Sequence, residues 1–250
     1  YLRLAAIVAE KYFGHKESGP IDCPACGSRG TPLFKKHGFF YEECPLCRTI
    51  FVSPRPAAKA FYDYYENSDS AKYFATTFYK ATAESRREKL WKPKSQSVQA
   101  ILKSYGAENH HVVDIGGGYG IFAEEYRALT GTDVAVIEPG PELAKICREK
   151  GLNVVQSFLE HVDASQLNSS SKAFISFELF EHLHDPEVFL KKLCTLMQKN
   201  DLFIFTTLSG TGLDVRVLWE DSNSISLQHL NFFNPRSIRL LAERVGLEIL

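Results

Sequence analysis

The sequence of 250 residues has almost no net charge, with 29 lysines and arginines against 30 aspartates and glutamates. Without a basic field, electrostatics alone does not draw a chain to nucleic acid or to an anionic membrane. No apolar run approaches the ~18 residues of a membrane-spanning helix. The apolar stretch at the N-terminus ends at Glu10 and Lys11, too early for a secretory signal peptide. These absences indicate a cytoplasmic protein with neither a membrane nor nucleic acid as its partner.

Cysteine is scarce, but its positions are not scattered. Four of the six cysteines form the pairs Cys23-Pro24-Ala25-Cys26 and Cys44-Pro45-Leu46-Cys47. This spacing is typical of a zinc site with four thiolate ligands, and disulfides are rare in a reducing compartment. A four-thiolate shell leaves no open position for water, so its metal is structural. We predict a structural zinc ion held by Cys23, Cys26, Cys44 and Cys47.

The length leaves room for one α/β domain and a small additional module. The hydrophobic share of 44% suits a globular chain with a core. The chain starts at Tyr1 rather than at methionine, and it stops at residues 246–250, which we expect to begin a sixth strand. We therefore expect an excerpt of a longer protein, truncated before its last strand.

One stretch combines a strand, a glycine turn and a helix. His111-Val112-Val113-Asp114-Ile115 is followed by Gly116, Gly117, Gly118 and Gly120, and then by a helical pattern from Ile121. Glycines are needed where the backbone adopts a positive φ or passes close to a ligand. The N-terminus of the helix then offers unpaired N–H groups to an anionic ligand group.

A second acid follows at the spacing that a nucleoside site requires. Residues 132–137 read as the next strand, and Glu138 ends it, 22 positions after Gly116. An acid near this spacing binds ribose hydroxyls in βαβ nucleotide sites. A dinucleotide fingerprint needs glycine or alanine where this chain has Ile121, so NAD or FAD is the second choice.

These residues resemble the first motif of the class I S-adenosylmethionine (SAM)-dependent methyltransferases, whose second strand also ends in an acid. The resemblance implies a Rossmann-like, doubly wound α/β sheet. It further implies a SAM site in which Gln156 or Ser157 stands where the family often has an acid for the adenine amino group. The cofactor-binding residues that it implies are Asp114, Gly116, Gly117, Gly118, Gly120, Glu138, Pro139, Ser157, Phe158 and Phe177.

A polar string follows the fourth predicted strand, residues 173–177. It runs from Glu178 through Glu181, His182 and His184 to Asp185-Pro186. Because ligands of open α/β sheets bind at the carboxyl ends of strands, we expect this loop to face the reacting groups. The string resembles the fourth-strand motif of many SAM methyltransferases, and we expect His182 near the reaction centre.

Several features occur together in one order: the cysteine pairs, Ser53-Pro54-Arg55-Pro56, an aromatic helix, the glycine motif, the Glu181-His182 loop and residues 229–233. This combination resembles the zinc-ribbon SAM methyltransferases that C-methylate nucleotide-linked keto-deoxysugars. Those enzymes carry a Tyr-x-Glu-His string that supplies the base. This chain has Ser226-Leu227-Gln228-His229, which keeps only the histidine.

An imidazole of near-neutral pKa suits removal of a proton from a methyl acceptor. We therefore expect His229 to be the general base, with His182 or Glu178 orienting the acceptor. The expected acceptor is a small molecule, a sugar or sugar nucleotide, methylated on carbon or oxygen.

The expected domains are residues 1–56 (N-terminal helix and zinc ribbon), 57–108 (helical connector and cofactor lid) and 109–250 (SAM-binding domain). Two short strands are expected between the cysteine pairs, at residues 33–34 and 39–41. In the connector, aromatic residues are frequent up to residue 79, residues 81–105 are expected to be helical with a break at Pro93, and Arg86, Arg87 and Lys89 are expected to form a solvated face.

Two other functions stay open. The first is an RNA-modifying methyltransferase that grips nucleic acid with its zinc ribbon. Residues 1–56 hold eight lysines and arginines against five acids, and four thiolates around one Zn²⁺ add about two negative charges, so the ribbon is nearly neutral. The second is a non-catalytic SAM-binding module of a larger protein. The sequence does not identify the acceptor atom or the oligomeric state.

Overall fold

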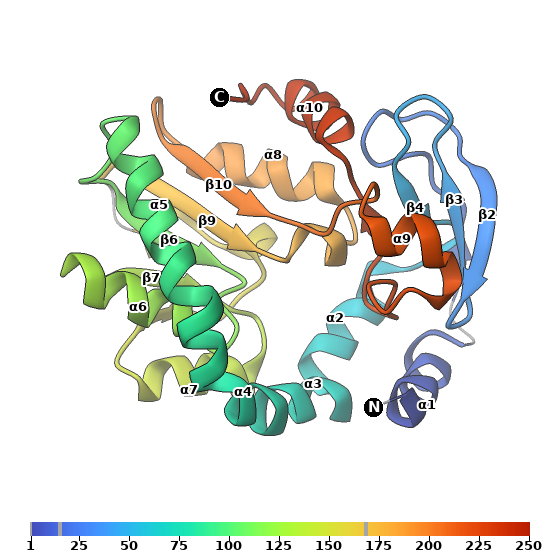
Figure 1. Ribbon diagram of the computed structural model, residues 1–250, viewed down its shortest axis with the longest axis horizontal. Helices are drawn as coiled ribbons and strands as arrows, with labels where there is room; N and C mark the ends of the chain where they lie inside the picture. The colour runs from blue at the N-terminus through green and yellow to red at the C-terminus, as the bar shows by residue number, and fades with distance from the viewer. Residues whose placement is uncertain (1, 15–16, 168–169) are drawn as a thin grey trace. The chain divides into compact units, whose positions relative to one another are not determined.

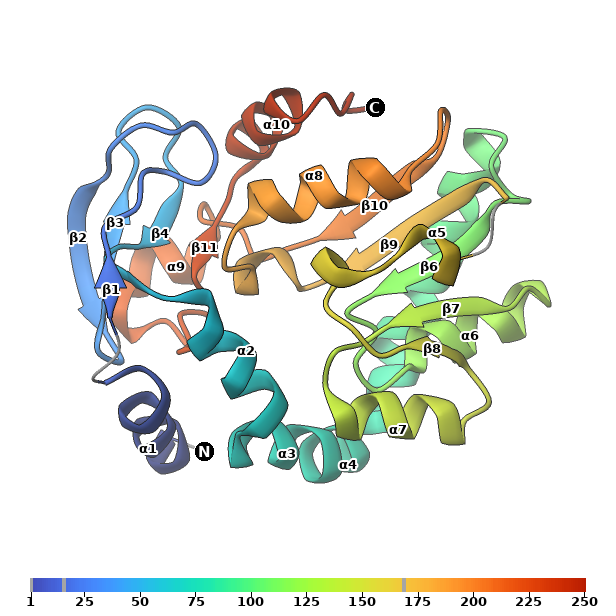
Figure 2. The same ribbon diagram turned by 180° about the vertical axis from the view of Figure 1, so that it is seen from behind.

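The computed structural model describes residues 2–14, 17–167 and 170–250, and the chain divides into two compact units (Figure 1, Figure 2). The ribbon unit comprises Tyr1–Tyr64, Glu178–Cys194 and Thr206–Leu250. The sheet unit comprises Tyr65–Phe177 and Thr195–Phe205. The chain therefore enters and leaves each unit more than once, and each unit is built from segments that are distant in sequence.

A five-stranded sheet in the order β10-β9-β6-β7-β8 forms the centre of the sheet unit. The pairs β6–β7, β6–β9 and β7–β8 are parallel. From β6, the chain adds strands in one direction through β7 and β8 and then returns to place β9 on the other side of β6. Open α/β sheets bind ligands at such a point, where the direction of strand addition changes. The predicted Rossmann-like fold is confirmed. The strands are β6 (His111–Ile115), β7 (Val134–Ile137), β8 (Asn153–Val155), β9 (Lys172–Phe177) and β10 (Leu202–Thr206).

The helices α5, α6 and α7 complete the core of this unit. The α6 helix buries Phe122, Ala123 and Tyr126, and Gly131 ends it in the left-handed conformation. These side chains pack with Val98 and Leu102 of α5 and with the buried residues of β6, β7 and β9. The bounds are α5 (Lys92–Ser104), α6 (Ile121–Thr130) and α7 (Pro141–Glu149), with two short 3₁₀ turns at Leu159–His161 and Ala164–Gln166.

The connector before α5 is helical almost throughout, and two expectations about it were wrong. The chain does not leave the helical conformation at Pro93, because the π-helical segment Arg87–Trp91 leads directly into α5. Arg87 is not on a solvated face, since it pairs with Glu124 at 2.9 Å and with Glu125 of α6. The other elements are α3 (Asp69–Tyr73), the π-helix Phe74–Phe78 and α4 (Tyr79–Arg86).

The ribbon unit contains a four-stranded sheet in the order β11-β4-β3-β2, whose pairs are all antiparallel. His37 and Gly38 both have positive φ, as a two-residue hairpin requires, and they join the two strands predicted between the cysteine pairs. The bounds are β2 (Thr31–Lys36), β3 (Phe39–Glu43), β4 (Ile50–Val52) and β11 (Asn231–Phe232); β1 (Ser18–Gly19) pairs separately with β5 (Arg55–Pro56).

The strand β11 was not predicted, and it brings the C-terminal part of the chain into the ribbon sheet. Asn231 lies opposite Phe51 in this pairing. The predicted strand at residues 246–250 is not formed. The remaining elements are α1 (Leu2–Phe13), α2 (Ala58–Asn67), α8 (Pro186–Leu196), α9 (Leu213–Leu218), α10 (Pro235–Arg244) and the 3₁₀ turns Phe180–His182 and Trp219–Asp221.

Within the described part of the chain, every helix is too short or too polar to cross a lipid bilayer.

Candidate functional site

The glycine loop leaves β6 in a conformation that only glycine adopts without strain. Gly116, Gly118 and Gly120 have φ values of +72°, +56° and +74°. The N–H of Gly116 donates to the carbonyl of Ile137 at 2.8 Å, which ties the loop to the end of β7. The loop therefore lies at the carboxyl ends of two neighbouring parallel strands.

Crowding fixes one further glycine of this loop, Gly117, and adds a second constraint on Gly120. A Cβ on Gly117 would lie 2.6 Å from Val136 Cγ1 and 2.9 Å from Asp114 Oδ2. A Cβ on Gly120 would lie 2.8 Å from both Cys147 Sγ and Leu152 Cδ1. Such contacts force neighbouring atoms to move, so the loop reaches its position only because both residues lack a side chain.

The carboxylate of Glu138 closes this site from the end of β7. Its Oε2 accepts the N–H of Gly118 at 2.9 Å, and its Oε1 accepts the N–H of Gly140 at 2.8 Å. A carboxylate offers about four lone-pair sites, so each oxygen retains acceptor capacity after these two bonds. Glu138 can therefore hold the glycine loop and still accept the two hydroxyls of a ribose.

Two buried acids share this site. Burial raises the pKa of Asp114 to about 7, and the charge of Glu138 raises it as well. Burial also raises the pKa of Glu138 to about 7, against the lowering effect of the N–H groups of Gly140 and Gly118. Keeping both acids here is unfavourable for the folded chain alone, which is typical of residues that serve a ligand.

The other predicted cofactor residues follow the ends of β7, β8 and β9. The hydroxyl of Ser157 donates to the carbonyl of Phe158 at 2.9 Å. Gln156 accepts a bond from Arg148 at 3.0 Å on the surface. Phe177 packs edge-on against Phe122, with ring centroids 5.0 Å apart. Pro139 is half-buried between Glu138 and Gly140.

Tyr79 was not singled out from the sequence, although it lies in the aromatic stretch that was noticed there. Its ring centroid is 6.2 Å from that of Tyr119 in the glycine loop. Burial raises the pKa of Tyr79, the charge of Arg86 lowers it, and the charge of Glu138 raises it. Tyr79 of α4 therefore lies near Tyr119 of the glycine loop.

A pocket of about 370 Å³ also opens beside Tyr119. Neither Asp114 nor Glu138 contributes to its walls, so we do not identify it with the glycine-loop site. Its lining residues are Ala75, Thr76, Lys80, Tyr119, Ile146, Glu149 and Lys150.

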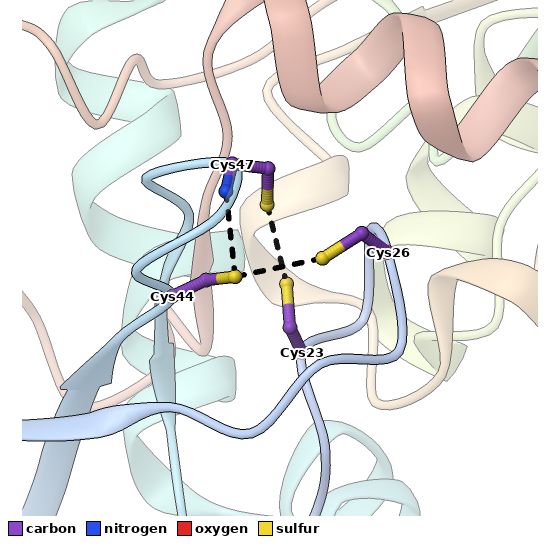
Figure 3. Close-up of side chains that lie close together, drawn as sticks. All are labelled: Cys23, Cys26, Cys44 and Cys47. Carbon is purple, nitrogen blue, oxygen red and sulfur yellow. Dashed lines mark hydrogen bonds between the residues drawn. The ribbon is translucent and has the colours of Figure 1, made fainter.

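The four predicted metal ligands meet in the ribbon unit, where their sulfurs face one another (Figure 3). The Sγ atoms of Cys23 and Cys47 are 3.5 Å apart, as are those of Cys26 and Cys44. Zinc–sulfur bonds of about 2.3 Å place the sulfurs of a tetrahedral site about 3.8 Å apart. The four thiols therefore have nearly the geometry that a zinc ion requires.

The backbone around the cysteines forms two matching turns. Gly27 donates to the carbonyl of Cys23 at 2.8 Å, and Arg48 donates to that of Cys44 at 2.9 Å. Both Gly27 and Arg48 have positive φ, of 75° and 63°. The N–H of Cys47 also points at the sulfur of Cys44 (Figure 3), an interaction that stabilises a thiolate.

A second cluster in the ribbon unit contains the predicted catalytic histidines. The ring centroids of His182 and His229 are 4.7 Å apart. The carboxylate of Glu181, only 1% exposed, lies with them, and the three side chains each offer a ligand atom within 4.8 Å of the others. We call Glu181, His182 and His229 the histidine cluster.

Backbone carbonyls orient both imidazoles. The Nδ1 of His229 donates to the carbonyl of Ser224, so its Nε2 carries the lone pair. The His182 ring donates to the carbonyl of Gln228. Burial is the main reason that the pKa of each imidazole is lowered to about 4. Both rings are therefore neutral at neutral pH, and the pKa of each lies well below the near-neutral value that was expected from the sequence.

The ribbon sheet holds this cluster in place. The Tyr41 hydroxyl of β3 donates to the carbonyl of His229 at 3.1 Å. The N–H of Leu230 donates to the carbonyl of Glu181 at 2.6 Å, joining the two segments that carry the histidines. Asn231 of β11 donates to the carbonyl of Leu183 at 2.7 Å and accepts from the buried Arg55 at 2.8 Å.

Glu178 precedes the cluster in a strained conformation, with φ of +52°. Its carboxylate accepts the Thr206 hydroxyl at 2.6 Å, and its charge acts on Glu181, His182 and His229. Strained residues of this kind are concentrated at functional sites. Glu181 received no role from the sequence, although its position directly before His182 in the polar string was a usable signal.

Comparison with known proteins agrees with this fold. A family model described as "Methyltransferase domain" matches residues 66–250. None of the curated proteins matches the chain. A SAM-dependent methyltransferase from Thermotoga maritima, described as a possible histamine N-methyltransferase, is similar in structure, with a TM-score of 0.54, 20% identity, and coverage of 70% of this chain and 78% of that one.

Two further solved structures are similar, and both contain S-adenosylhomocysteine (SAH). The plantazolicin methyltransferase BpumL has a TM-score of 0.54 and 12% identity, with coverage of 74% of this chain and 73% of its own. The magnesium protoporphyrin IX methyltransferase of Synechocystis PCC 6803 has a TM-score of 0.52 and 14% identity, with coverage of 70% and 86%. At these identities, the likeness concerns the fold.

Proposed function

The chain belongs to the methyltransferase domain family and is a SAM-dependent methyltransferase, and from that premise we propose that it methylates a small-molecule acceptor, a sugar or sugar nucleotide. The observation that carries the SAM-binding part of the proposal is the Glu138 carboxylate, which accepts hydrogen bonds from the N–H groups of Gly118 and Gly140 at the end of β7. One structural neighbour is described as a possible histamine N-methyltransferase and another as a magnesium protoporphyrin IX methyltransferase, and both named compounds are small molecules.

The residues at the glycine loop fit SAM. Glu138 would accept the ribose hydroxyls, and Ser157 and Phe158 at the end of β8 would contact the adenine. Bound SAM supplies a methyl group that its positively charged sulfur activates for transfer. The polypeptide must hold the acceptor in line with that group, exclude water and take up the acceptor proton.

The histidine cluster supplies the groups for the acceptor side. We assign the acceptor proton to Nε2 of His229, because Nδ1 is committed to the carbonyl of Ser224. His182 and Glu178 would orient the acceptor by hydrogen bonds. In the balanced reaction, the acceptor X–H and SAM give X–CH₃, SAH and one proton, which His229 receives and passes to water.

The zinc ion would be structural in this scheme. All four positions of the shell are filled by thiolates, and Cys23, Cys44 and Cys47 are buried. Its role would be to fix the strands β3 and β4, against which the segment of His229 is held.

The test is incubation of the protein with SAM carrying a labelled methyl group and pools of sugar nucleotides and small metabolites, followed by mass spectrometry. We expect label in a small-molecule product. Substitution His229→Gln should slow turnover at least about 100-fold while SAH affinity stays within a few-fold. Label found only in RNA would contradict the proposed acceptor, and SAH binding without any labelled product would contradict catalysis.

A further inference from the structure

The histidine cluster has the composition of a metal site that is separate from the four cysteines. Two imidazoles and one carboxylate bind divalent first-row transition metals with positions left open for a substrate. The three ligand atoms lie within 4.8 Å of one another. Ligand atoms bound to one metal ion at about 2.1 Å lie roughly 3–4 Å from one another. Small rotations of the three side chains would therefore bring their ligand atoms to bonding distance from one ion.

The surroundings of the three side chains also match those of metal ligands. A ligating histidine usually donates its other ring N–H to a carbonyl, which fixes the ring and its tautomer. His229 donates to Ser224 and His182 to Gln228 in this way. The third ligand is fixed as well, because the Thr207 hydroxyl donates to Glu181 Oε2 at 2.8 Å.

Burial gives a further reason. Glu181 is almost completely buried, and within the described part of the chain it forms no ion pair with lysine or arginine. A buried carboxylate is unfavourable unless a positive charge compensates for it. A divalent cation would supply that charge.

We propose that Glu181, His182 and His229 bind one divalent first-row transition-metal ion, of the class of Mn²⁺, Fe²⁺ or Zn²⁺, and that the acceptor binds to it. The inference deepens the proposed function. The binding of the acceptor to the ion rests on that function, whereas the metal site itself does not. This inference replaces one step of the proposed function: with the ion bound, Nε2 of His229 would be a ligand, and water instead of His229 would take up the acceptor proton. The acceptor oxygen then loses its proton to water because coordination to the ion lowers its pKa.

The experiment takes protein that contains one zinc ion per chain, enough to fill the four-cysteine site alone, titrates it with Mn²⁺ and follows binding by electron paramagnetic resonance. Mn²⁺ prefers oxygen and imidazole ligands over thiolates, so the occupied cysteine site does not interfere. We expect one Mn²⁺ per chain, and at least about 10-fold weaker binding in His182→Ala, His229→Ala and Glu181→Gln. The variant Thr207→Val, which only frees the carboxylate, should also weaken binding by about 10-fold.

The control is His161→Ala, which removes an exposed imidazole from the sheet unit and should leave Mn²⁺ binding unchanged. Absence of Mn²⁺ binding, or equal binding by all variants, would overturn the inference. Calorimetry with SAH on the same samples separates the two proposals. SAH binding without Mn²⁺ binding would overturn the metal proposal and leave the methyltransferase site in place. Mn²⁺ binding without SAH binding would overturn the SAM site and leave the metal proposal in place.

Discussion

The glycine-loop site and the histidine cluster are built in opposite ways. The first comes from consecutive parts of one βαβα segment, and its principal contact joins Glu138 to Gly118, 20 positions away. The second joins residues around 181 and 229 and rests on Tyr41, which is 188 positions from His229. One site is local in sequence, and the other depends on contacts between distant segments.

This difference determines what each site needs in order to form. The glycine loop requires its own strand and turn chemistry, and the parallel sheet supplies the rest. The histidine cluster requires the ribbon strands, because β11 pairs with β4 and Asn231 bonds to Leu183 and Arg55. We therefore expect perturbations of the ribbon to affect the histidine cluster much more than the glycine loop.

The largest effect should come from removal of the structural zinc. Cys44 is completely buried and directly precedes the turn into β4, so Cys44→Ser should abolish stoichiometric zinc. The loss of stability should be at least about 5 kcal/mol, because zinc binding contributes about 10 kcal/mol or more to small zinc modules. Turnover should fall at least about 100-fold while SAH affinity falls less than about 10-fold. Zinc analysis, denaturant unfolding and SAH calorimetry measure these quantities.

The matched control is Cys194→Ser, which changes a half-buried cysteine outside the four-cysteine site. It should leave the zinc content at one per chain. Equal losses of SAH affinity and turnover in Cys44→Ser would show that the two sites are not separable in this way.

Sequence patterns predicted which residues gather at the glycine loop and which four cysteines meet, because both depend on spacing. Asp114, the glycines and Glu138 occupy fixed positions in a βα unit, and the two cysteine pairs form matching turns. The hairpin at His37-Gly38 follows from local turn chemistry in the same way. For these residues, knowledge of the immediate neighbours in sequence is enough to place the side chain.

The features that escaped prediction depend on long-range contacts. No local pattern shows that Asn231 extends the ribbon sheet, because a two-residue strand has no periodicity. Arg87 was expected in solvent, yet it pairs with Glu124 and Glu125 on a later helix. The position of Glu181 directly before His182 was a signal in the sequence, but its proximity to His229 was not, because only the fold brings those two residues together.

A smaller effect, opposite in sign, should come from Asp114→Asn. Burial raises the pKa of Asp114 to about 7, so between about pH 4 and 7 the folded chain binds more protons at this site than the unfolded chain. The contribution of Asp114 to stability therefore falls as the pH rises to about 7 and is constant above. Asp114→Asn should be more stable than the wild type at pH 8, by about 3–4 kcal/mol at most, and the gain should shrink towards pH 4.

The same variant should bind SAH more weakly, because residues that serve a ligand commonly lower the stability of the folded chain. Denaturant unfolding at several pH values and calorimetry measure both effects. Asp133→Asn, which changes an exposed acid just before β7, is the control and should show neither. A gain in stability that is independent of pH would contradict the assignment of the effect to ionisation of Asp114.

The smallest effect compares two glycines at the ends of α6 that have nearly the same φ, +74° at Gly120 and +73° at Gly131. Gly131→Ala should cost about 1 kcal/mol, because the new Cβ meets no atom within 4 Å and only the left-handed conformation is unfavourable. Gly120→Ala should cost about 2–3 kcal/mol, since its Cβ also collides with Cys147 and Leu152. Only Gly120→Ala should weaken SAH binding, because Gly120 belongs to the glycine loop and Gly131 does not. Equal unfolding free energies and equal SAH affinities for the two variants would show that close packing at Gly120 is not what positions the loop.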